Sequence, residues 1–390
     1  MKIAFVVQRC GKEIVGGAES LCLNVAQHLS KYFDIEILTS CAIDYMSWEN
    51  HYQEGTEKIG NVTVRRFKVD FKRDVSKFNE ISNKVLADIH SIDDEILWMK
   101  MQGPYCSGLF DFLNKNEKSF DLFVFFTYLY ATTFYGLPLV SNKSVLVPLA
   151  HDEPPLKLSI YDEIFKKTKA IIYHTEEEEN LIMQRFEISK IKGKLIGYGI
   201  DEMISVPEIF SPISNLDFPY LLYVGRIDKS KGCDELIEYF KKYKKQHDSK
   251  LKLVLVGPKI FDFEEDDSII HLGVLNEQQK AYALKNASIF VMPSKYESFS
   301  IATMEAWMFK KPVIVNSQSL VLKGHCEKSN GGLYYENYEE FAECINLILS
   351  DNSLHEQMGK NGYAYVKENY GWARIINEYR IFLNSVMQPS

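Results

Sequence analysis

Short apolar runs that alternate with helical patterns are the feature that most restricts the fold of this 390-residue chain. In the first half, the runs are KIAFVVQ, DIEILTS, DLFVFFTY, SVLVPLA and AIIYHT. In the second half, YLLYVGR, LKLVLVG, SIFVMPS and KPVIVN repeat the same alternation. Strands that are apolar throughout belong to parallel sheets covered by helices on both faces. The pattern therefore predicts βαβ units and an α/β fold.

The alternation starts again after a weakly periodic stretch with several prolines, at residues 205–219. We interpret this stretch as a linker that opens a second α/β domain, which also suits the length of the chain. The expected domains are residues 1–204 and 205–369, each a doubly wound, Rossmann-like sheet. Ligands of such sheets bind at the carboxyl ends of the strands, so we expect the functional residues there, in a cleft between the domains.

Charge and cysteine content exclude several classes of protein. The net charge of -8 gives no general attraction to nucleic acid. Two basic stretches, at residues 65–73 and 241–250, are interpreted as solvated faces, with docking to a membrane surface as the alternative. The seven cysteines are scattered and form no CxxC motif, so neither a disulfide framework nor a zinc site is expected.

The location expected from the sequence is a reducing cytoplasm. The chain opens directly on a strand-like run, without the pattern of a signal peptide. It also lacks any run of about 18 apolar residues, the length needed to span a bilayer. Membrane association, if present, is therefore expected to be peripheral.

The first candidate site follows the first predicted strand. Gly16 and Gly17 directly precede a helix that is expected to begin near Ala18. Their backbone can approach a ligand closely, and the helix N-terminus can face an anion. The stretch is not the G-x-G-x-x-G motif of NAD-binding folds. A turn made only for tight geometry is the alternative interpretation.

The second candidate site follows the first strand of the second domain. In YLLYVGRIDKSKG, Arg226 and Lys231 lie on the loop between the strand and the next helix. Arginine binds phosphate oxygens as a fork and lysine acts as a point charge, so the pair suits a diphosphate. Surface cations near a turn are the alternative.

The third candidate site is the segment PSKYESFSIATMEAWMFKKP, which contains an acid inside an apolar helix. Ser300 is expected to be the N-cap of a helix that runs to about Phe309, with Glu305 in its second turn. A carboxylate on an apolar helix needs partners, and ribose hydroxyls would supply donors. A salt bridge between Glu305 and a core lysine or arginine is the alternative. Glu297, in the preceding loop, would point beyond the phosphates.

These motifs together resemble the retaining GT-B glycosyltransferases, specifically the large family usually numbered four, also described as glycosyl transferases group 1. The resemblance rests on GRIDKSKG, on the two acids Glu297 and Glu305 separated by seven residues, and on GGAE, LAHDEPP, GYGID and KPVIVN in the same order. It runs the length of the chain. It implies the GT-B fold, and that the amphipathic stretch 370–390 is a helix packing back on the first domain.

The resemblance also implies roles for particular residues. Arg226 and Lys231 would bind the donor diphosphate, Glu305 the ribose, and Glu297 the hydroxyls of the transferred sugar. His151, at the end of SVLVPLA, corresponds to a histidine that contacts the donor sugar near the reacting carbon; a structural hydrogen bond is its alternative.

Glycines and serines of two loops complete the implied donor site. Gly16 and Gly17 would lie against the donor phosphates. Many relatives have glycines around the phenylalanine of the donor loop, where this chain has Ser298, Phe299 and Ser300. The serine hydroxyls would either replace the backbone contact to the phosphates or only cap the helix.

The expected function is transfer of a hexose-type sugar from a nucleotide diphosphate sugar to a hydroxyl acceptor, a growing polysaccharide or glycolipid. Retention of anomeric configuration is implied by the resemblance, and neither a metal nor another cofactor is expected. Two alternatives remain at this stage. One is a GT-B nucleotide-sugar epimerase, and the other is a catalytically silent nucleotide-sugar binder that supports a partner enzyme.

Overall fold

The computed structural model describes residues 1–14, 16–87, 89–202 and 216–388. The chain divides into two compact units, of which the first comprises Met1–Gly197 with Ile375–Ser390 and the second comprises Tyr198–Arg374. The sequence had placed the corresponding limits after residues 204 and 369. Most of the expected linker, residues 205–219, lies outside the described residues. Among the helices that are described, none is long and apolar enough to cross a membrane.

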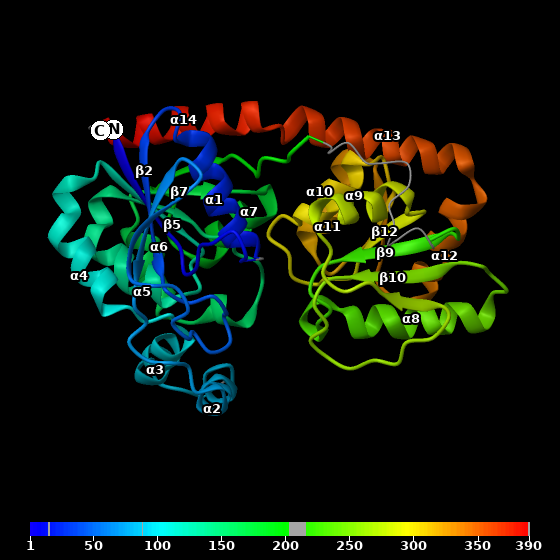
Figure 1. Cartoon of the computed structure of the whole chain (residues 1–390), viewed down its shortest axis with the longest axis horizontal. Coiled ribbons are helices and arrows are strands. Elements are labelled where there is room, and N and C mark those ends of the chain that lie inside the picture. Colours follow the sequence, from blue (N-terminus) through cyan, green and yellow to red (C-terminus); the bar gives the residue numbers. More distant parts are fainter. Residues whose placement is uncertain (15, 88, 203–215, 389–390) are drawn as a thin grey trace. The chain divides into compact units, whose positions relative to one another are not determined.

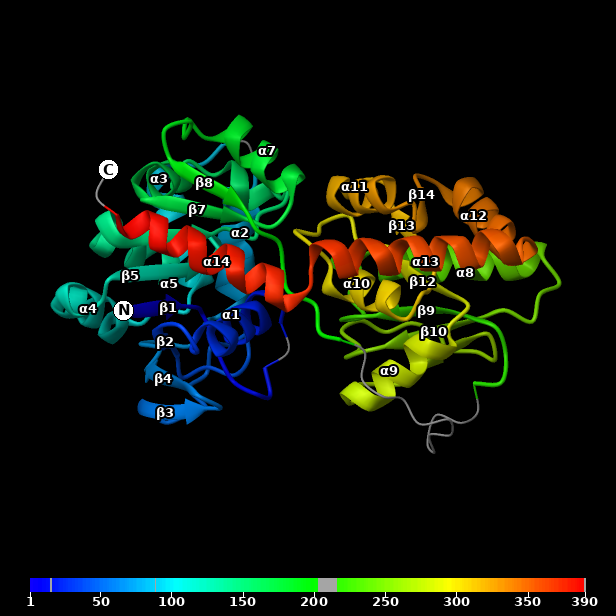
Figure 2. The same ribbon diagram turned by 90° about the horizontal axis from the view of Figure 1, so that it is seen from above.

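The first unit is built on an eight-stranded sheet with the strand order β3-β4-β2-β1-β5-β6-β7-β8, in which all strands but β6 are labelled in Figure 2. Neighbouring strands are parallel except for the hairpin of β3 and β4 at one edge, which the sequence analysis did not anticipate. The strands are β1 (Lys2–Val6), β2 (Asp34–Ser40), β3 (Gly55–Ile59), β4 (Val62–Phe67), β5 (Leu122–Phe126), β6 (Ser144–Val147), β7 (Ala170–Tyr173) and β8 (Lys192–Leu195).

Helices connect these strands and cover the sheet. The α-helices are α1 (Gly17–Leu29), α2 (Val75–Val85), α3 (Ile92–Gln102), α4 (Ser107–Asn116), α5 (Ala131–Gly136), α6 (Tyr161–Lys167), α7 (Glu176–Arg185) and α14 (Trp372–Met387). Three 3-10 turns are η1 (Glu117–Ser119), η2 (Leu137–Lys143) and η3 (Pro154–Lys157). From Ile375 onward α14 belongs to this unit, where Lys194 of β8 lies 3.2 Å from Glu378.

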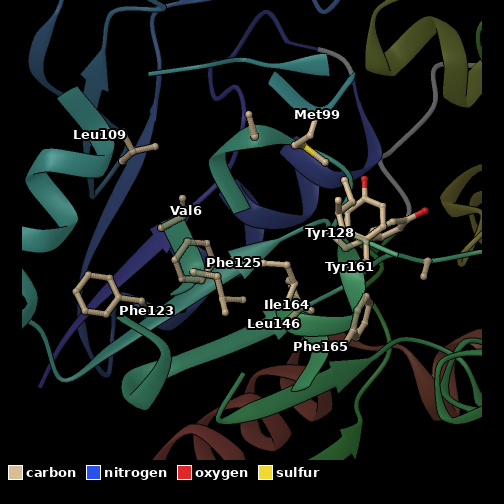
Figure 3. Close-up of a cluster of buried hydrophobic side chains, with 14 of the residues drawn as sticks. Val6, Met99, Leu109, Phe123, Phe125, Tyr128, Leu146, Tyr161, Ile164 and Phe165 are labelled. Atoms are coloured by element: carbon tan, nitrogen blue, oxygen red, sulfur yellow. The ribbon is translucent and has the colours of Figure 1, made fainter. Parts of the chain in front are cut away.

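The core of the first unit lies between the central strands and the helices after them (Figure 3). All five residues of β5 are buried, as expected for a central parallel strand. Beyond the strand ends, the rings of Tyr128 and Tyr161 meet edge to face, with centroids 4.7 Å apart. The core therefore extends to the carboxyl edge of the sheet, where it supports the loops that follow the strands.

The second unit is a six-stranded, entirely parallel sheet with the order β11-β10-β9-β12-β13-β14. Its strands are β9 (Tyr220–Val224), β10 (Lys252–Val256), β11 (Ile269–His271), β12 (Ile289–Met292), β13 (Val313–Asn316) and β14 (Gly332–Tyr335). Its helices are η4 (Lys229–Lys231), α8 (Cys233–Gln246), α9 (Glu277–Asn286), α10 (Ile301–Met308), α11 (Leu320–Ser329), α12 (Tyr338–Ser350) and α13 (Asn352–Asn369).

The second sheet is doubly wound around β9. From β9 the chain proceeds to β10 on one side, whereas β12 pairs with β9 on the other side. Helices α8 and α10 accordingly lie on opposite faces of the sheet (Figure 1). The loops after β9 and β12 meet at this switch point, which is where open parallel sheets bind their ligands.

Candidate functional site

The loop after β9 is shaped by Gly225. Its φ is +156°, and a Cβ there would lie 2.7 Å from the hydroxyl oxygen of Tyr223. Both facts favour glycine at this position. The backbone N–H of Gly225 donates to the Val256 carbonyl at 2.9 Å, which holds the loop against β10. Arg226 follows, with 35% of its side chain exposed and Nη2 at 3.9 Å from Asp228 Oδ2.

The cation Lys231 is positioned by a short capped turn. Asp228 precedes η4 and accepts the N–H of Ser230 at 2.9 Å. Gly232 then has a φ of +72°. A Cβ at Gly232 would lie 2.5 Å from the carbonyl oxygen of Pro293. This close approach joins the loop after β9 to the loop after β12.

The same approach brings together two residues that the sequence analysis had assigned to the donor. Lys231 Nζ lies 2.7 Å from Glu297 Oε1, and the two side chains are 29% and 14% exposed. The pair is therefore partly shielded, yet still accessible from the carboxyl edge of the sheet. Arg226 lies on the loop that leads to Lys231, so the loops at the switch point carry two cations and the two carboxylates beside them, Glu297 and Asp228.

Helix α10 begins in an unusual backbone conformation. Ser300 has φ +68° and ψ +78°, in the left-handed region that L-residues adopt rarely. Its hydroxyl lies 2.9 Å from Thr303 Oγ1. It occupies the N-cap position but caps no backbone N–H with its side chain. The expectation that Ser300 caps the helix by its side chain is therefore wrong, because its hydroxyl is engaged with Thr303.

Glu305 has a lysine partner in this structure. Its Oε1 lies 2.8 Å from Nζ of Lys280, a residue of α9 that also lies 2.9 Å from Glu277. Burial raises the pKa of Glu305, and the nearby ammonium of Lys280 opposes that shift. The salt bridge that the sequence left open as an alternative is thus present. Since 26% of the Glu305 side chain remains exposed, a ligand can still reach it.

Phe299 anchors the loop between β12 and α10. It is 4% exposed and stacks on Tyr198 at 5.8 Å between ring centroids. Edge-to-face contacts to Tyr370 at 4.9 Å and His325 at 5.4 Å complete the cluster. Its neighbour Ser298 is half-buried. Phe299 therefore fixes the position of this loop through packing.

His325 is a structural member of that cluster. It is buried, and its Nδ1 lies 3.0 Å from the Tyr365 hydroxyl. Burial lowers its pKa to about 3, so the imidazole is neutral at ordinary pH. Its packing and its neutral imidazole are typical of a structural histidine.

In the first unit, His151 lies beyond the end of β6. Its Nδ1 is 3.7 Å from Glu153 Oε1, and a quarter of its side chain is exposed. Glu153 in turn accepts the Tyr128 hydroxyl at 2.7 Å. The core tyrosine therefore orients the carboxylate beside His151.

The His151 loop is also held by Glu178, whose role the sequence analysis missed. Glu178 is 1% exposed. It accepts the backbone N–H groups of Ala150 and His174, each at 2.7 Å. It belongs to the acid run 176–179, which forms the first turn of α7. The sequence signal was an acid three residues after Thr175, which caps α7 by accepting the Glu178 N–H.

The glycine loop lies at the start of α1. Gly16 is extended, and a Cβ on it would lie 2.3 Å from Glu19 Oε2, whereas a Cβ on Gly17 would meet nothing within 4 Å. Glu19 forms a buried ion pair with Arg9 at 2.5 Å. The close approach of Glu19 therefore accounts for Gly16, while the open space beside Gly17 leaves room for a ligand.

The first basic stretch is a solvated face only in part: Lys68 and Lys72 are exposed, whereas Arg66 and Arg73 depart from the expectation. Arg66 is 3% exposed and donates to the carbonyl oxygen of Cys10 at 2.7 Å. Arg73 is half-buried and donates to the carbonyl oxygens of Tyr45 and Met101 at 3.0 and 3.1 Å. Flanking aromatic rings cover both guanidinium groups, with Arg66 at 3.8 Å from the centroid of Tyr52. The second stretch lies on α8 and the loop after it, and its lysines are exposed or half-exposed.

Possible metal ligands are dispersed in the part of the chain that the structure describes. No group of three or more histidine, cysteine, aspartate or glutamate side chains there is arranged to hold an ion. Arg226 and Lys231 are cationic side chains on the loop at the switch point of the second sheet.

The second unit contains a match to a known protein family. Residues 207–365 match the family described as Glycosyl transferases group 1. An uncharacterized glycosyltransferase of Methanocaldococcus jannaschii is 30% identical over 42% of this chain, and the match spans 45% of that protein. A second one from the same organism is 24% identical over 94% of both chains. A capsular polysaccharide biosynthesis glycosyltransferase of Staphylococcus aureus is 26% identical over 41% of this chain and 46% of its own.

A solved structure supports the architecture of the whole chain. HepE of Anabaena, in complex with UDP and glucose, has a TM-score of 0.69 and 16% sequence identity, and the match covers 99% of this chain and 100% of that one. The GT-B fold expected from the sequence is confirmed. The family match and the glycosyltransferase relatives support a group 1 glycosyltransferase. The chain thus has the GT-B fold, and its second unit carries the match to the glycosyl transferases of group 1.

Proposed function

We propose that this protein is a retaining glycosyltransferase of family 4, which moves a hexose-type sugar from a nucleotide diphosphate sugar to a hydroxyl acceptor. The observation that carries the proposal is the contact between Lys231 and Glu297 beside Arg226, at the switch point of the second sheet. This is where open parallel sheets bind phosphorylated ligands. The complex of HepE with UDP and glucose supports a nucleotide-sugar donor.

In the proposed complex, Arg226 and Lys231 bind the donor diphosphate. The sugar–phosphate bond breaks as negative charge develops on the β-phosphate, and these two cations stabilise that charge. The N-terminus of α10 adds its backbone N–H groups, with Ser298, Phe299 and Ser300 forming the loop that lies along the donor. Because the side chains themselves supply the positive charge, we propose that no metal is needed.

The two carboxylates acquire their ligands when the donor enters. Before that, each is held by a lysine, Glu297 by Lys231 at 2.7 Å and Glu305 by Lys280 at 2.8 Å. A diphosphate competes for Lys231 and releases Glu297 to accept the hydroxyls of the transferred sugar. Glu305 accepts the ribose hydroxyls while Lys280 keeps its contact to Glu277, 2.9 Å away. The lysines thus keep the carboxylates paired until the donor arrives.

We assign His151, Gly16 and Gly17 of the first unit to the same donor. His151 would contact the sugar near the reacting carbon, and Gly16 and Gly17 would approach the phosphates. The acceptor oxygen forms its bond to the anomeric carbon on the face that the phosphate leaves, and the departing phosphate accepts the proton of the acceptor hydroxyl. Attack on that same face gives retention. The proposed acceptor is a glycan or glycolipid, supported by the resemblance to the capsular polysaccharide enzyme. A cytoplasmic location, with peripheral contact to the inner face of a membrane as a further option, is supported by the free cysteines, which are buried.

The test is product formation from UDP-, GDP- and ADP-sugars with a panel of glycan acceptors, followed by mass spectrometry and by NMR of the new anomeric centre. The proposal predicts one product that retains the donor configuration, lost in Lys231→Ala and kept in Lys229→Ala. Lys229 is the matched control because it is an exposed lysine of the same turn. Isomerisation of the donor without acceptor would establish the epimerase instead, and donor binding without any turnover would establish the silent binder.

A further inference from the structure

A cavity of about 240 Å³ lies in the first unit. It is lined by side chains of several elements, among them Tyr45, Arg73, Phe78, Asn79, Gln102 and Tyr130. Three of these residues are aromatic and two carry amides, a combination that suits the apolar faces and hydroxyls of a sugar ring. Sites for drug-sized ligands measure roughly 300–1,000 Å³, so this cavity suits a single ring with its substituents.

The guanidinium of Arg73 makes the cavity cationic. Its Nε donates to the Met101 carbonyl at 3.1 Å, and Nη1 donates to the Tyr45 carbonyl at 3.0 Å. Nη2 donates to the carbonyl oxygen and to the side-chain oxygen of Gln102. All of these acceptors are neutral. Burial lowers the pKa of Arg73 to about 10, so the group still carries its charge at neutral pH.

Arg73 differs from the other arginines in the body of the first unit because its hydrogen-bond acceptors are all neutral. Arg9, Arg65, Arg66 and Arg185 each contact a carboxylate, at distances of 2.5, 2.7, 2.5 and 2.9 Å. Among the described residues, no carboxylate lies within ion-pair distance of Arg73. Asp44 acts on it from further away, and the oxygens of Asp44 accept hydrogen bonds from Met46 and Ser47 instead.

A half-buried cation without a counter-ion is costly, and an anion that enters the cavity would remove that cost. The lining can also donate hydrogen bonds to such an anion. Burial raises the pKa of Tyr130 to about 12, so its hydroxyl stays protonated at neutral pH. The Asn79 side chain is exposed at the rim and offers an amide N–H₂.

We propose that this cavity binds an anionic substituent of the acceptor, a sugar carboxylate or phosphate, with Arg73 as its counter-ion. The inference rests on the proposed function, because it names the chemical class of acceptor on which that function acts. An acidic sugar would place its ring against Tyr45 and Phe78 and its anion toward Arg73. A neutral acceptor would leave the charge of Arg73 uncompensated.

The test uses the full chain and two variants of one exposed position. Asn79→Glu supplies an internal carboxylate to the cavity, and Asn79→Gln is the matched neutral control of the same size. The probes are glucuronate, glucose 6-phosphate and glucose, titrated by calorimetry and by thermal shift. Comparison of glucuronate with glucose 6-phosphate shows whether the cavity binds a carboxylate or a phosphate. Glucose, which is neutral, shows whether binding requires an anion.

We expect the native chain and Asn79→Gln to bind one of the acidic sugars at least about tenfold more tightly than glucose, since a charge-assisted hydrogen bond is worth that factor. Asn79→Glu should lose that preference and unfold at a higher temperature than Asn79→Gln, because its carboxylate neutralises Arg73. Equal affinity for glucose and the acidic sugars, or equal binding by Asn79→Glu and Asn79→Gln, would overturn the proposal. Binding of UDP-sugars is measured in parallel, so that failure of the donor site is distinguished from failure of this cavity.

Discussion

Lys231 and Glu297 lie 2.7 Å apart although 66 residues separate them in the chain. The contact exists because Gly232 lets the turn after β9 approach the Pro293 carbonyl at the end of β12. A side chain at Gly232 would force these two loops apart. The pair therefore links the fold of the second unit to the chemistry proposed for it.

The first prediction concerns Glu305. Replacement by Gln removes the charge that would accept the ribose hydroxyls, and donor affinity should fall about tenfold. Folding should be kept, because Lys280 retains Glu277 at 2.9 Å. Calorimetric titration with the nucleotide sugar measures the change. The control is Glu277→Gln, which removes the other carboxylate near Lys280 and should bind the donor like the native chain. Equal loss in both variants would show that Glu305 acts only through Lys280.

The second prediction concerns the backbone at Ser300, whose φ is +68°. Ser300→Gly and Ser300→Ala both lose the hydroxyl bond to Thr303, but only glycine relieves the left-handed conformation. We expect the glycine variant to be more stable than the alanine variant by about 1 kcal/mol, the reverse of the order in a helix interior. Urea denaturation of the two variants measures this difference in the free energy of unfolding. A more stable alanine variant would contradict the left-handed conformation.

The third prediction concerns Glu178, which holds the N–H groups of Ala150 and His174. Glu178→Gln replaces one accepting oxygen by an amide donor and should cost about 2 kcal/mol of folding free energy. It should also lower kcat more than it weakens donor binding, because the loop of His151 loses an anchor. Glu176→Gln, at an exposed position of the same run, should change stability by less than about 0.5 kcal/mol. Similar losses in both variants would count against this anchoring role.

The fourth prediction concerns pH. His325 titrates near pH 3 in the folded chain, against an ordinary value of 6.5. The unfolded chain therefore binds a proton below pH 6.5 that the folded chain does not, so stability falls as pH decreases from 6.5 toward 3. Between pH 6.5 and 5 this amounts to about 2 kcal/mol.

Urea denaturation at several pH values checks this contribution. His325→Gln keeps a polar partner for Tyr365 but cannot titrate, so its stability should fall less over the same range, whatever its value at pH 7.5. Parallel losses in the native and variant proteins would mean that His325 is protonated in the folded state.

Much of the fold follows from local patterns. The apolar runs became strands because strands buried on both faces need continuous apolar sequence, as β5 shows. The hairpin of β3 and β4 was missed because β3 is polar and β4 alternates apolar and polar residues, so neither carries such a run. Its signal was the two-residue turn Gly60 and Asn61, in which Gly60 has φ +62°.

Only those residues of the candidate site that directly follow a strand could be predicted from the sequence. The positions of Arg226, Lys231 and Glu297 follow from their place after β9 and β12. The partners of buried charges do not, because they depend on which helices meet in three dimensions. Lys280 of α9 forms the ion pair with Glu305, and Glu178 accepts a hydrogen bond from the Ala150 backbone N–H. The burial of Arg66 and Arg73 was missed for the same reason.

The proposed donor site is tested most directly by the binding of UDP-, GDP- and ADP-sugars to the native chain, to Lys231→Ala and to Lys229→Ala. Thermal shift measures the stabilisation that a bound donor gives, about 2.7 kcal/mol at one hundred times its Kd. We predict that one nucleotide stabilises the native chain and Lys229→Ala, and that Lys231→Ala loses this stabilisation. If no nucleotide sugar binds, or if Lys231→Ala binds it as well as the native chain does, the donor site proposed at Lys231 and Glu297 is contradicted.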